Sequence, residues 1–213
     1  MPQNVRVVPA ILTDDPKALE TMVRQAETFT DYVQFDIMDG GFVPSRSISS
    51  DDIRRLPMKL KWEAHLMVHE PARYFADFRL AGARKVIFHF EAVKSPQRTI
   101  AQARKFGLKV GIAINPETYA SAVLPLAAKV DSILLLSVHP GFYGARFVPK
   151  VMQKIADLRP SGLEIGIDGG IKEANIEEVA RSGVNDIYVG SAIFRQSDPA
   201  QAYRHLQMLA QAA

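Results

Sequence analysis

The sequence predicts an α/β fold: a (β/α)8 TIM barrel that forms a single domain over residues 1–213. Eight short, apolar and β-branched runs recur along the chain, and their starts lie 22 to 32 residues apart. Most of these runs lack polar alternation, which is typical of parallel strands covered on both faces. Amphipathic stretches with helical spacing lie between them. Eight units of roughly 27 residues reach the lower size limit of about 200 residues for such barrels.

The expected strands and helices alternate along the chain. The strands begin at Val5, Tyr32, Lys61, Lys85, Lys109, Asp131, Leu163 and Asp186. Helices are expected after Asp15, Ser95 and Asp198, because each of these capping residues precedes a proline. Glycines suited to end a helix stand at Gly82, Gly107 and Gly183. An open doubly wound sheet is the alternative, but it has fewer strands, and no Gly-x-Gly-x-x-Gly follows the first run.

The composition excludes several classes of protein. Apolar residues make up 47% and charged residues 23%, as in ordinary soluble proteins. There are no cysteines, so a disulfide framework and a thiolate metal site are excluded. With no secretory pattern and no apolar run of about 18 residues, we expect a cytoplasmic protein without a membrane partner. A net charge of +3 from scattered basic residues disfavours nucleic acid but permits a small anionic substrate.

Polar residues and one glycine stand at or near the ends of the expected strands. They are Asp36, His65, His89, Asn115, Ser137, His139, Asp168, Gly190 and Ser191. Any one of them could simply face water at a strand end. In a barrel, however, all eight carboxyl ends meet at one mouth, where active sites form. The whole set therefore indicates a functional site.

Within this set, the residues most indicative of a specific chemistry are Asp36, His65 and Asp168. One imidazole and two carboxylates can bind a divalent cation. In a second, compatible interpretation, Asp36 and Asp168 are a proton-transfer pair, each serving one face of a substrate carbon. A cation between them would hold them ionised and stabilise an enediolate oxygen. His65 could instead be a core histidine satisfied by hydrogen bonds.

Glycine loops after the last two strands suggest phosphate binding. "GIDGGI" contains Gly169 and Gly170, and "YVGSAIF" contains Gly190 and Ser191. Backbone N–H groups and a short helix often hold phosphate at this place in barrels, although the glycines could merely form tight turns. "HPGFYGARF", with Gly141 and Gly144, is expected to cover the mouth as a flap.

Seven short motifs follow one another between about Pro9 and Phe194: "FDIMDGGFVP", "AHLMV", "FHFEA", "NPET", "SVHPGF", "IDGGI" and "VGSAIF". In their order and approximate spacing, the chain resembles the ribulose-phosphate 3-epimerase family. The resemblance implies an isomerase of carbohydrate metabolism, in the pentose phosphate pathway. It would interconvert ribulose 5-phosphate and xylulose 5-phosphate by inverting C3 through an enediolate. We also expect a homo-oligomer.

The resemblance also implies roles for single residues. Asp36 and Asp168 would be the two acid/base groups and, with His65, would bind a divalent cation (Zn, Mn, Fe, Co or Mg). Met38 and Met67 would line the cavity near the intermediate. The loops with Gly169–Gly170 and Gly190–Ser191 would hold the phosphate of the substrate.

The chain departs from the family pattern around the expected site. The departures are Ala10, Gln34, Gly41, Ser45, Leu136, His139, Tyr143 and Ala145. Gln34 stands where the family has its first histidine ligand, and an amide oxygen is a weaker zinc donor than imidazole. Metal binding could therefore be weakened, shifted toward harder cations, or absent. His89 or His139 could replace the missing ligand, and His139 is the first candidate.

Three functions remain open on these residues. The first is the ketose-phosphate epimerase. The second is a divergent paralogue that acts on another sugar phosphate, since the departures surround one cavity. The third is a catalytically idle barrel that binds a phosphorylated ligand, against which the retention of both aspartates argues. A lysine-assisted decarboxylase is disfavoured, because "DIMD" contains no lysine. Asp39 is expected to shape the turn with Gly40.

Overall fold

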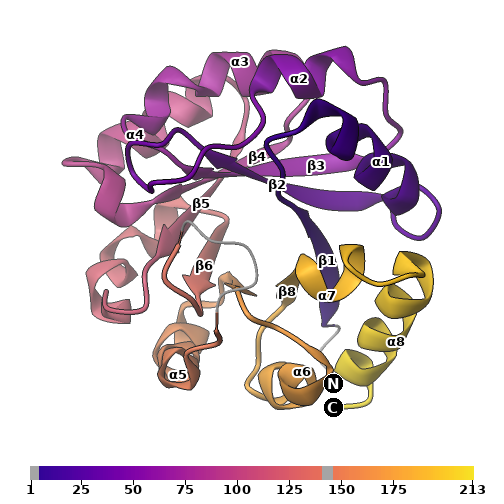
Figure 1. Cartoon of the computed structure of the whole chain (residues 1–213). Coiled ribbons are helices and arrows are strands. Elements are labelled where there is room, and N and C mark those ends of the chain that lie inside the picture. The colour runs from indigo at the N-terminus through magenta and orange to yellow at the C-terminus, as the bar shows by residue number, and fades with distance from the viewer. Residues whose placement is uncertain (1–4, 141–145) are drawn as a thin grey trace.

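The computed structural model of the chain describes residues 5–140 and 146–213, and these residues form a closed parallel barrel in which β1 pairs with β8. The strands are β1 (Arg6–Ile11), β2 (Tyr32–Met38), β3 (Lys61–Met67), β4 (Lys85–His89), β5 (Lys109–Ile114), β6 (Ser132–Leu136), β7 (Glu164–Asp168) and β8 (Asp186–Val189). Each starts within one residue of the predicted position. Figure 1 shows the strands inside a ring of helices, so the predicted fold class is confirmed.

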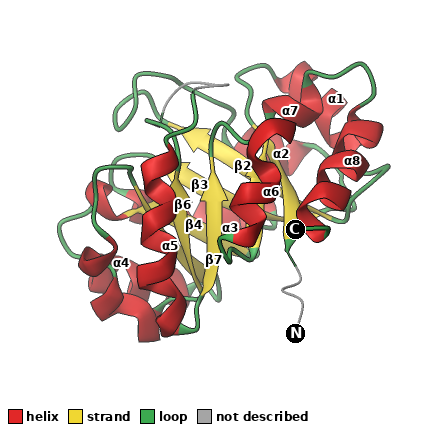
Figure 2. Ribbon diagram, turned by 90° about the horizontal axis from the view of Figure 1, so that it is seen from below, coloured by secondary structure: helices red, strands yellow, loops and turns green. Residues whose placement is uncertain are grey.

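The helices lie outside the barrel, as Figure 2 shows. They are α1 (Pro16–Ala26), α2 (Ser50–Arg55), α3 (Phe75–Ala81), α4 (Pro96–Lys105), α5 (Gln153–Leu158), α6 (Glu173–Arg181), α7 (Ser191–Phe194) and α8 (Pro199–Gln211). Asp15 and Asp198 cap their helices through side-chain oxygens, as predicted, whereas the Ser95 side chain makes no capping bond. No helix in the described part of the chain is long and apolar enough to cross a membrane.

The expectation of a helix after every strand is wrong between β5 and β6. Two 3-10 segments, η3 (Ala120–Ala122) and η4 (Leu124–Lys129), occupy this connection. Pro125 lies at the start of η4 and has no backbone N–H to donate, so it interrupts an α-helical hydrogen-bond ladder here. Four further 3-10 segments are η1 (Pro71–Arg73), η2 (Phe90–Ala92), η5 (Pro149–Met152) and η6 (Arg159–Ser161).

Side chains of each strand point alternately outward and inward, so the barrel has one apolar core outside the strands and another inside them. On β2, Val33 and Phe35 face outward into the large apolar core that the helices cover. The intervening residues face the inside of the barrel, because successive side chains of a strand point to opposite faces. A smaller apolar cluster that includes Val8, Leu134 and Tyr188 fills part of the interior.

Charged residues fill the end of the barrel at which the strands begin, opposite the mouth formed by their carboxyl ends. The Lys85 Nζ lies 3.0 Å from both Glu63 Oε2 and Glu164 Oε1. Asp186 accepts two hydrogen bonds, of 2.9 and 2.8 Å, from the guanidinium of Arg6. Glu63, Lys85 and Asp186 are buried. Since a buried charge is tolerated when it is paired, this network can stabilise the barrel away from its mouth.

Candidate active site

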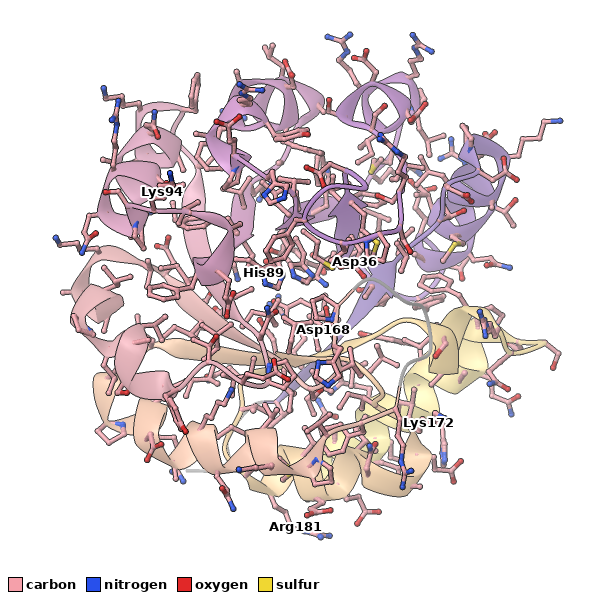
Figure 3. The ribbon with its side chains drawn as sticks, turned by 60° about the vertical axis from the view of Figure 1, so that its left-hand side comes forward. Asp36, His89, Lys94, Asp168, Lys172 and Arg181 are labelled. Carbon is pink, nitrogen blue, oxygen red and sulfur yellow. The ribbon has the colours of Figure 1, made fainter. Side chains whose placement is uncertain are left out.

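The strand register brings the predicted residues together. Asp36 on β2 pairs directly with His65 on β3, and Asp168 ends β7 on the other side of the barrel. All three line a cavity at the carboxyl ends of the strands. In Figure 3, Asp36 and Asp168 lie near the centre of the ring of elements. This placement is the one expected for the active site of a barrel enzyme.

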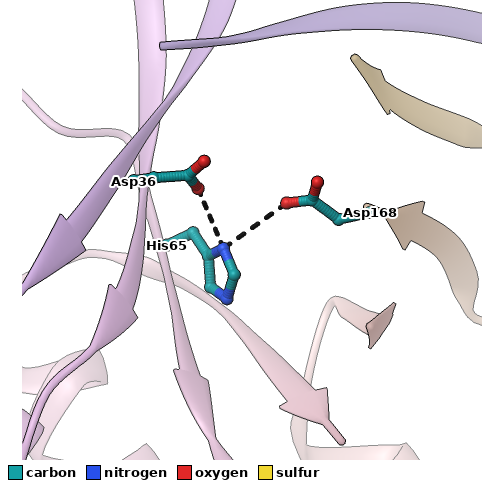
Figure 4. A group of neighbouring side chains, drawn as sticks. All are labelled: Asp36, His65 and Asp168. Carbon is teal, nitrogen blue, oxygen red and sulfur yellow. Dashed lines mark hydrogen bonds and ion pairs between the residues drawn. The ribbon is translucent and has the colours of Figure 1, made fainter. Parts of the chain in front are cut away.

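One imidazole lies between the two carboxylates, as Figure 4 shows. The His65 Nδ1 is 2.9 Å from Asp36 Oδ1 and 3.5 Å from Asp168 Oδ2. His65 is buried, and the Asp36 and Asp168 side chains are only 10% and 13% exposed. The two acidic groups therefore share one small region that is largely closed to water, where charges interact more strongly than at the surface.

Gln34 bridges the same two carboxylates. Its Nε2 donates to Asp36 Oδ1 at 2.9 Å and to Asp168 Oδ2 at 2.8 Å. The side chain is fully buried, and its Oε1 has no hydrogen-bond partner. A buried polar atom without a partner is costly and calls for an explanation. The sequence placed Gln34 at the site but did not predict that it joins the carboxylates.

Burial and neighbouring charges shift the ionisation of this group. Burial, reinforced by the charge of Asp168, raises the pKa of Asp36 to about 6, against the hydrogen bonds from His65 and Gln34. Burial disfavours the His65 imidazolium, but hydrogen bonds and charges from Asp168 and Asp36 outweigh it and raise the pKa of His65 to about 9. Carboxylates with perturbed pKa values in a cleft are typical of acid/base sites.

Three donors in this group suit a metal ion. One ligand atom each from Asp36, His65 and Asp168 lies within 4.8 Å of the others, which allows bonds of about 2 Å to a shared ion. The unpartnered Oε1 of Gln34 is a fourth potential donor beside them. Turning the amide over would exchange its oxygen and nitrogen, which have nearly the same shape. This group of side chains could therefore bind a divalent cation.

The two remaining candidate histidines differ. His89, the last residue of β4, is buried, and its Nε2 lies 3.0 Å from the His65 Nε2. Burial lowers the pKa of His89 to about 4, so its ring is neutral at pH 7. The structure does not bring His139, the first candidate for the missing ligand, into the cluster. Its side chain is 73% exposed and lies 3.1 Å from Glu117 rather than in the cluster, because it follows β6 beyond the turn out of the barrel.

Glu91 is a neighbour of the site that the sequence did not indicate. Its Oε2 lies 3.5 Å from the His89 Nδ1. It stands in the quoted motif "FHFEA", two residues after His89. That short spacing was the available signal, but the contact depends on how η2 turns after the strand.

Apolar residues border the acidic group. Met38 and Met67 are buried, pack with Val43 and line the same cavity. Two departures from the family pattern, Ala10 and Leu136, also line it. The cavity therefore combines a polar floor with apolar walls, as small-molecule sites usually do.

The predicted glycine loops border this cavity as well. Gly169, Gly170, Gly190 and Ser191 line it, and Ser191 begins α7. Gly169 has a φ of +115°, and a Cβ atom there would lie 2.5 Å from a methyl of Val138. Gly141 and Gly144, like Tyr143 and Ala145, lie outside the described residues.

Asp39 has the turn-forming role that the sequence predicted. Its Oδ1 accepts hydrogen bonds from the backbone of Gly41 and Phe42, and its Oδ2 accepts one from His69. Gly40 follows with a φ of +74°. Asp39 thus shapes the loop after β2 rather than joining the acidic group.

Comparison with known proteins places this chain in a family. The ribulose-phosphate 3 epimerase family matches residues 6–194. The chain belongs to this family. A ribulose-phosphate 3-epimerase from Synechocystis sp. is 39% identical over 95% of this chain and 93% of its own length, and one from Escherichia coli K12 is 36% identical over 90% of each. Ribulose-phosphate 3-epimerases are isomerases, and the predicted enzyme class is confirmed.

Solved structures share the barrel at lower sequence identity. A crystal structure of KGPDC from Streptococcus mutans matches with a TM-score of 0.78 at 13% identity, covering 99% of both chains. The 3-hexulose-6-phosphate synthase from Salmonella typhimurium matches with a TM-score of 0.69 at 17% identity, covering 97% of this chain and 98% of its own. These likenesses support the barrel fold of this chain.

Proposed function

We propose that the protein interconverts ribulose 5-phosphate and xylulose 5-phosphate by inverting C3, with Asp36 and Asp168 as the acid/base pair. The observation that carries this proposal is the meeting of two carboxylates, from β2 and β7, at one imidazole and one amide. One carboxylate takes the C3 proton and leaves an enediolate. The other, as its acid, returns a proton to the opposite face of C3.

The surroundings of the pair suit this reaction. One aspartate must be ionised and the other protonated at the start, and the raised pKa of Asp36 favours such a divided state. Met38 and Met67 offer an apolar wall beside the reacting carbons. The loops at Gly169–Gly170 and Gly190–Ser191 are the proposed phosphate site, since they border the same cavity and carry backbone N–H groups.

We further propose that Asp36, His65, Asp168 and the Oε1 of Gln34 hold a divalent cation. Three oxygens and one nitrogen form a harder donor set than one with two imidazoles, so this set shifts the metal preference away from Zn²⁺ and toward Mn²⁺ or Mg²⁺. Such a cation would supply positive charge that stabilises the enediolate and acidifies the C3 proton. Without a cation, His65 and Gln34 hold the two carboxylates in place through the hydrogen bonds already described.

Solvent isotope exchange tests the proposed function. The purified protein is incubated with ribulose 5-phosphate in D₂O, with Mn²⁺, Mg²⁺, Zn²⁺, Co²⁺ or Fe²⁺, and products are followed by NMR. We expect xylulose 5-phosphate with deuterium at C3. Asp39→Asn, a change to a turn residue outside the acidic group, is the matched control and should retain exchange. No exchange with any of these cations would exclude the proposal.

The residues of the cavity wall suggest a second candidate substrate. Ala10 and Leu136 both line the cavity and differ from the family pattern, which makes another sugar phosphate the second candidate substrate. A panel of pentulose and hexulose phosphates, compared by kcat/KM, separates the candidates. A hexulose phosphate with the higher kcat/KM would replace ribulose 5-phosphate as the substrate.

A further inference from the structure

We propose that Tyr188, in the floor of the cavity, determines how many carbons a substrate can have between its reacting carbon and its phosphate. This inference rests on the proposed function, which puts the phosphate at Gly190 and the reacting carbon between Asp36 and Asp168, the two carboxylates that face each other in Figure 4. It adds a length to that function: two intervening carbons, as in a pentulose 5-phosphate, and not three, as in a hexulose 6-phosphate.

Tyr188 lies between the two ends of such a substrate. In the register of β7 and β8, Asp168 pairs directly with Tyr188. Gly190 follows Tyr188 by two residues, at the end of the same strand. Tyr188, Gly190 and Asp168 all line the cavity. A substrate that reaches from the loop at Gly190 to the carboxylates therefore passes across Tyr188.

The Tyr188 side chain points into the barrel. Its neighbours along β8, Ile187 and Val189, belong to the outer apolar core, whereas Tyr188 belongs to the cluster inside the strands. This placement follows from the alternation of side chains along a strand. Tyr188 is 2% exposed and is among the largest of the fully buried side chains, so an aromatic ring fills the interior at this level.

Gly166 shows at which depth the ring lies. This residue stands two positions before Asp168 on β7, so it faces the same interior one step further from the mouth. A Cβ atom at Gly166 would lie 2.7 Å from Tyr188 Cε2, and the ring therefore occupies the space that a side chain would need. The ring lies below Asp168 and forms the floor of the cavity beside it.

The buried charges at the far end of the barrel hold the tip of Tyr188. Burial raises the pKa of Tyr188, and its interactions with Glu63 and Asp186 raise it further, which places the hydroxyl next to these carboxylates and keeps it protonated. Glu63 is itself held by Lys85 Nζ at 3.0 Å and by the Tyr32 hydroxyl at 2.8 Å. The floor is therefore rigid and does not move down to admit an extra carbon.

A third intervening carbon has no room on the other side either. With both ends of the substrate held, a longer chain must bow away from the straight path. Val138 lines the cavity and packs so closely on the loop after β7 that a Cβ atom at Gly169 would lie 2.5 Å from its methyl group. Tyr188 and Val138 therefore limit the width of the path, and shortening Tyr188 should widen it.

Polyol phosphates test this limit, because they lack a carbonyl group and are not turned over. Ribitol 5-phosphate and glucitol 6-phosphate differ by one carbon, and titration calorimetry gives the affinity of the protein for each. We expect the unchanged protein to bind the five-carbon compound about 10- to 100-fold more tightly. Tyr188→Val removes the ring and retains a residue suited to a strand. This variant should bind the two compounds with nearly equal affinity.

Tyr188→Phe is the matched control, because it retains the ring and removes only the hydroxyl. It should keep the preference for the five-carbon compound. Inorganic phosphate is the second control, since it needs only the phosphate loops. Its affinity should be the same for Tyr188→Val as for the unchanged protein.

Two results would overturn the role of Tyr188. Equal affinity of the unchanged protein for the two polyol phosphates would do so, whether or not a variant folds. An affinity ratio that stays the same in Tyr188→Val would do so too. The isotope-exchange assay keeps this inference apart from the proposed function: exchange at C3 without length discrimination removes only the role of Tyr188, whereas length discrimination without exchange counts against the epimerase.

Discussion

At the scale of single residues, Gln34 determines the character of the acidic group. Its amide donates to both Asp36 and Asp168 while its own oxygen has no partner. The side chain therefore serves the carboxylates in the arrangement seen here and, with the amide turned over, offers an oxygen to a cation. A neutral amide in place of an imidazole reduces the affinity for soft or borderline metals more than for hard ones.

Exchanging this residue should change the metal preference. Gln34→His replaces an oxygen donor by an imidazole nitrogen, and we expect the ratio of Zn²⁺ to Mn²⁺ affinity to rise by about tenfold or more, roughly 1.4 kcal/mol. Competition titration calorimetry measures that ratio. Gln34→Leu, which removes the donor, is the control and should weaken both metals. An unchanged ratio in Gln34→His would show that residue 34 does not contact the cation.

At the scale of elements, the loop after β7 depends on a glycine that touches the residues following β6. Gly169 has φ +115° and lies against Val138, while the Ser137 hydroxyl donates to the carbonyl groups of Asp168 and Gly169. These contacts tie the proposed phosphate loop to the strand that carries Asp168. A side chain at this position would disturb both the loop and the acidic pair.

Gly169→Ala should therefore cost more than backbone strain alone. The left-handed conformation costs an alanine about 1–2 kcal/mol, and the 2.5 Å approach to Val138 adds about 1–3 kcal/mol of overpacking. Gly162→Ala is a matched control, because Gly162 has φ +71° with no atom within 4 Å of the added carbon. Urea unfolding measures both variants. Equal losses would mean that the contact with Val138 is unimportant.

Sequence patterns predicted the elements better than the contacts between them. Strand starts and the positions of Asp36, His65 and Asp168 followed from apolar runs and from polar residues at their ends. The orientation of Gln34 toward both carboxylates, and of Glu91 toward His89, depends on packing between distant segments. Patterns within a short stretch of sequence therefore do not predict it. They also could not show that the candidate His139 lies outside the cluster, since proximity to a strand end does not specify where a side chain points.

At the scale of the whole molecule, the barrel separates its functional mouth from a stabilising end. The mouth contains the acidic pair, and the opposite end contains the network of Lys85, Glu63 and Glu164. Glu63 also accepts a 2.8 Å hydrogen bond from the Tyr32 hydroxyl. The fold tolerates buried charges at both ends of the closed barrel, because each buried charge has a partner that offsets the cost of removing it from water.

Removing Lys85 should destabilise the fold without altering the mouth. Lys85→Met leaves the fully buried Glu63 uncompensated, which we expect to cost about 3–5 kcal/mol of unfolding free energy. Lys61→Met is the control, because Lys61 also begins a strand but forms an exposed pair with Asp31, so its loss should cost at most about 1 kcal/mol. Thermal or urea unfolding compares them. Similar stability of the two variants would contradict the role of the network.

The central claim is that Asp36 and Asp168 each serve one face of the reacting carbon. The most direct test is the rate at which Asp36→Asn and Asp168→Asn interconvert ribulose 5-phosphate and xylulose 5-phosphate, measured for the two variants side by side. Each change removes one of the two proton-transfer groups, so both rates should fall by about 10²- to 10⁴-fold. A variant that retained the rate of the unchanged enzyme within about tenfold would contradict the account.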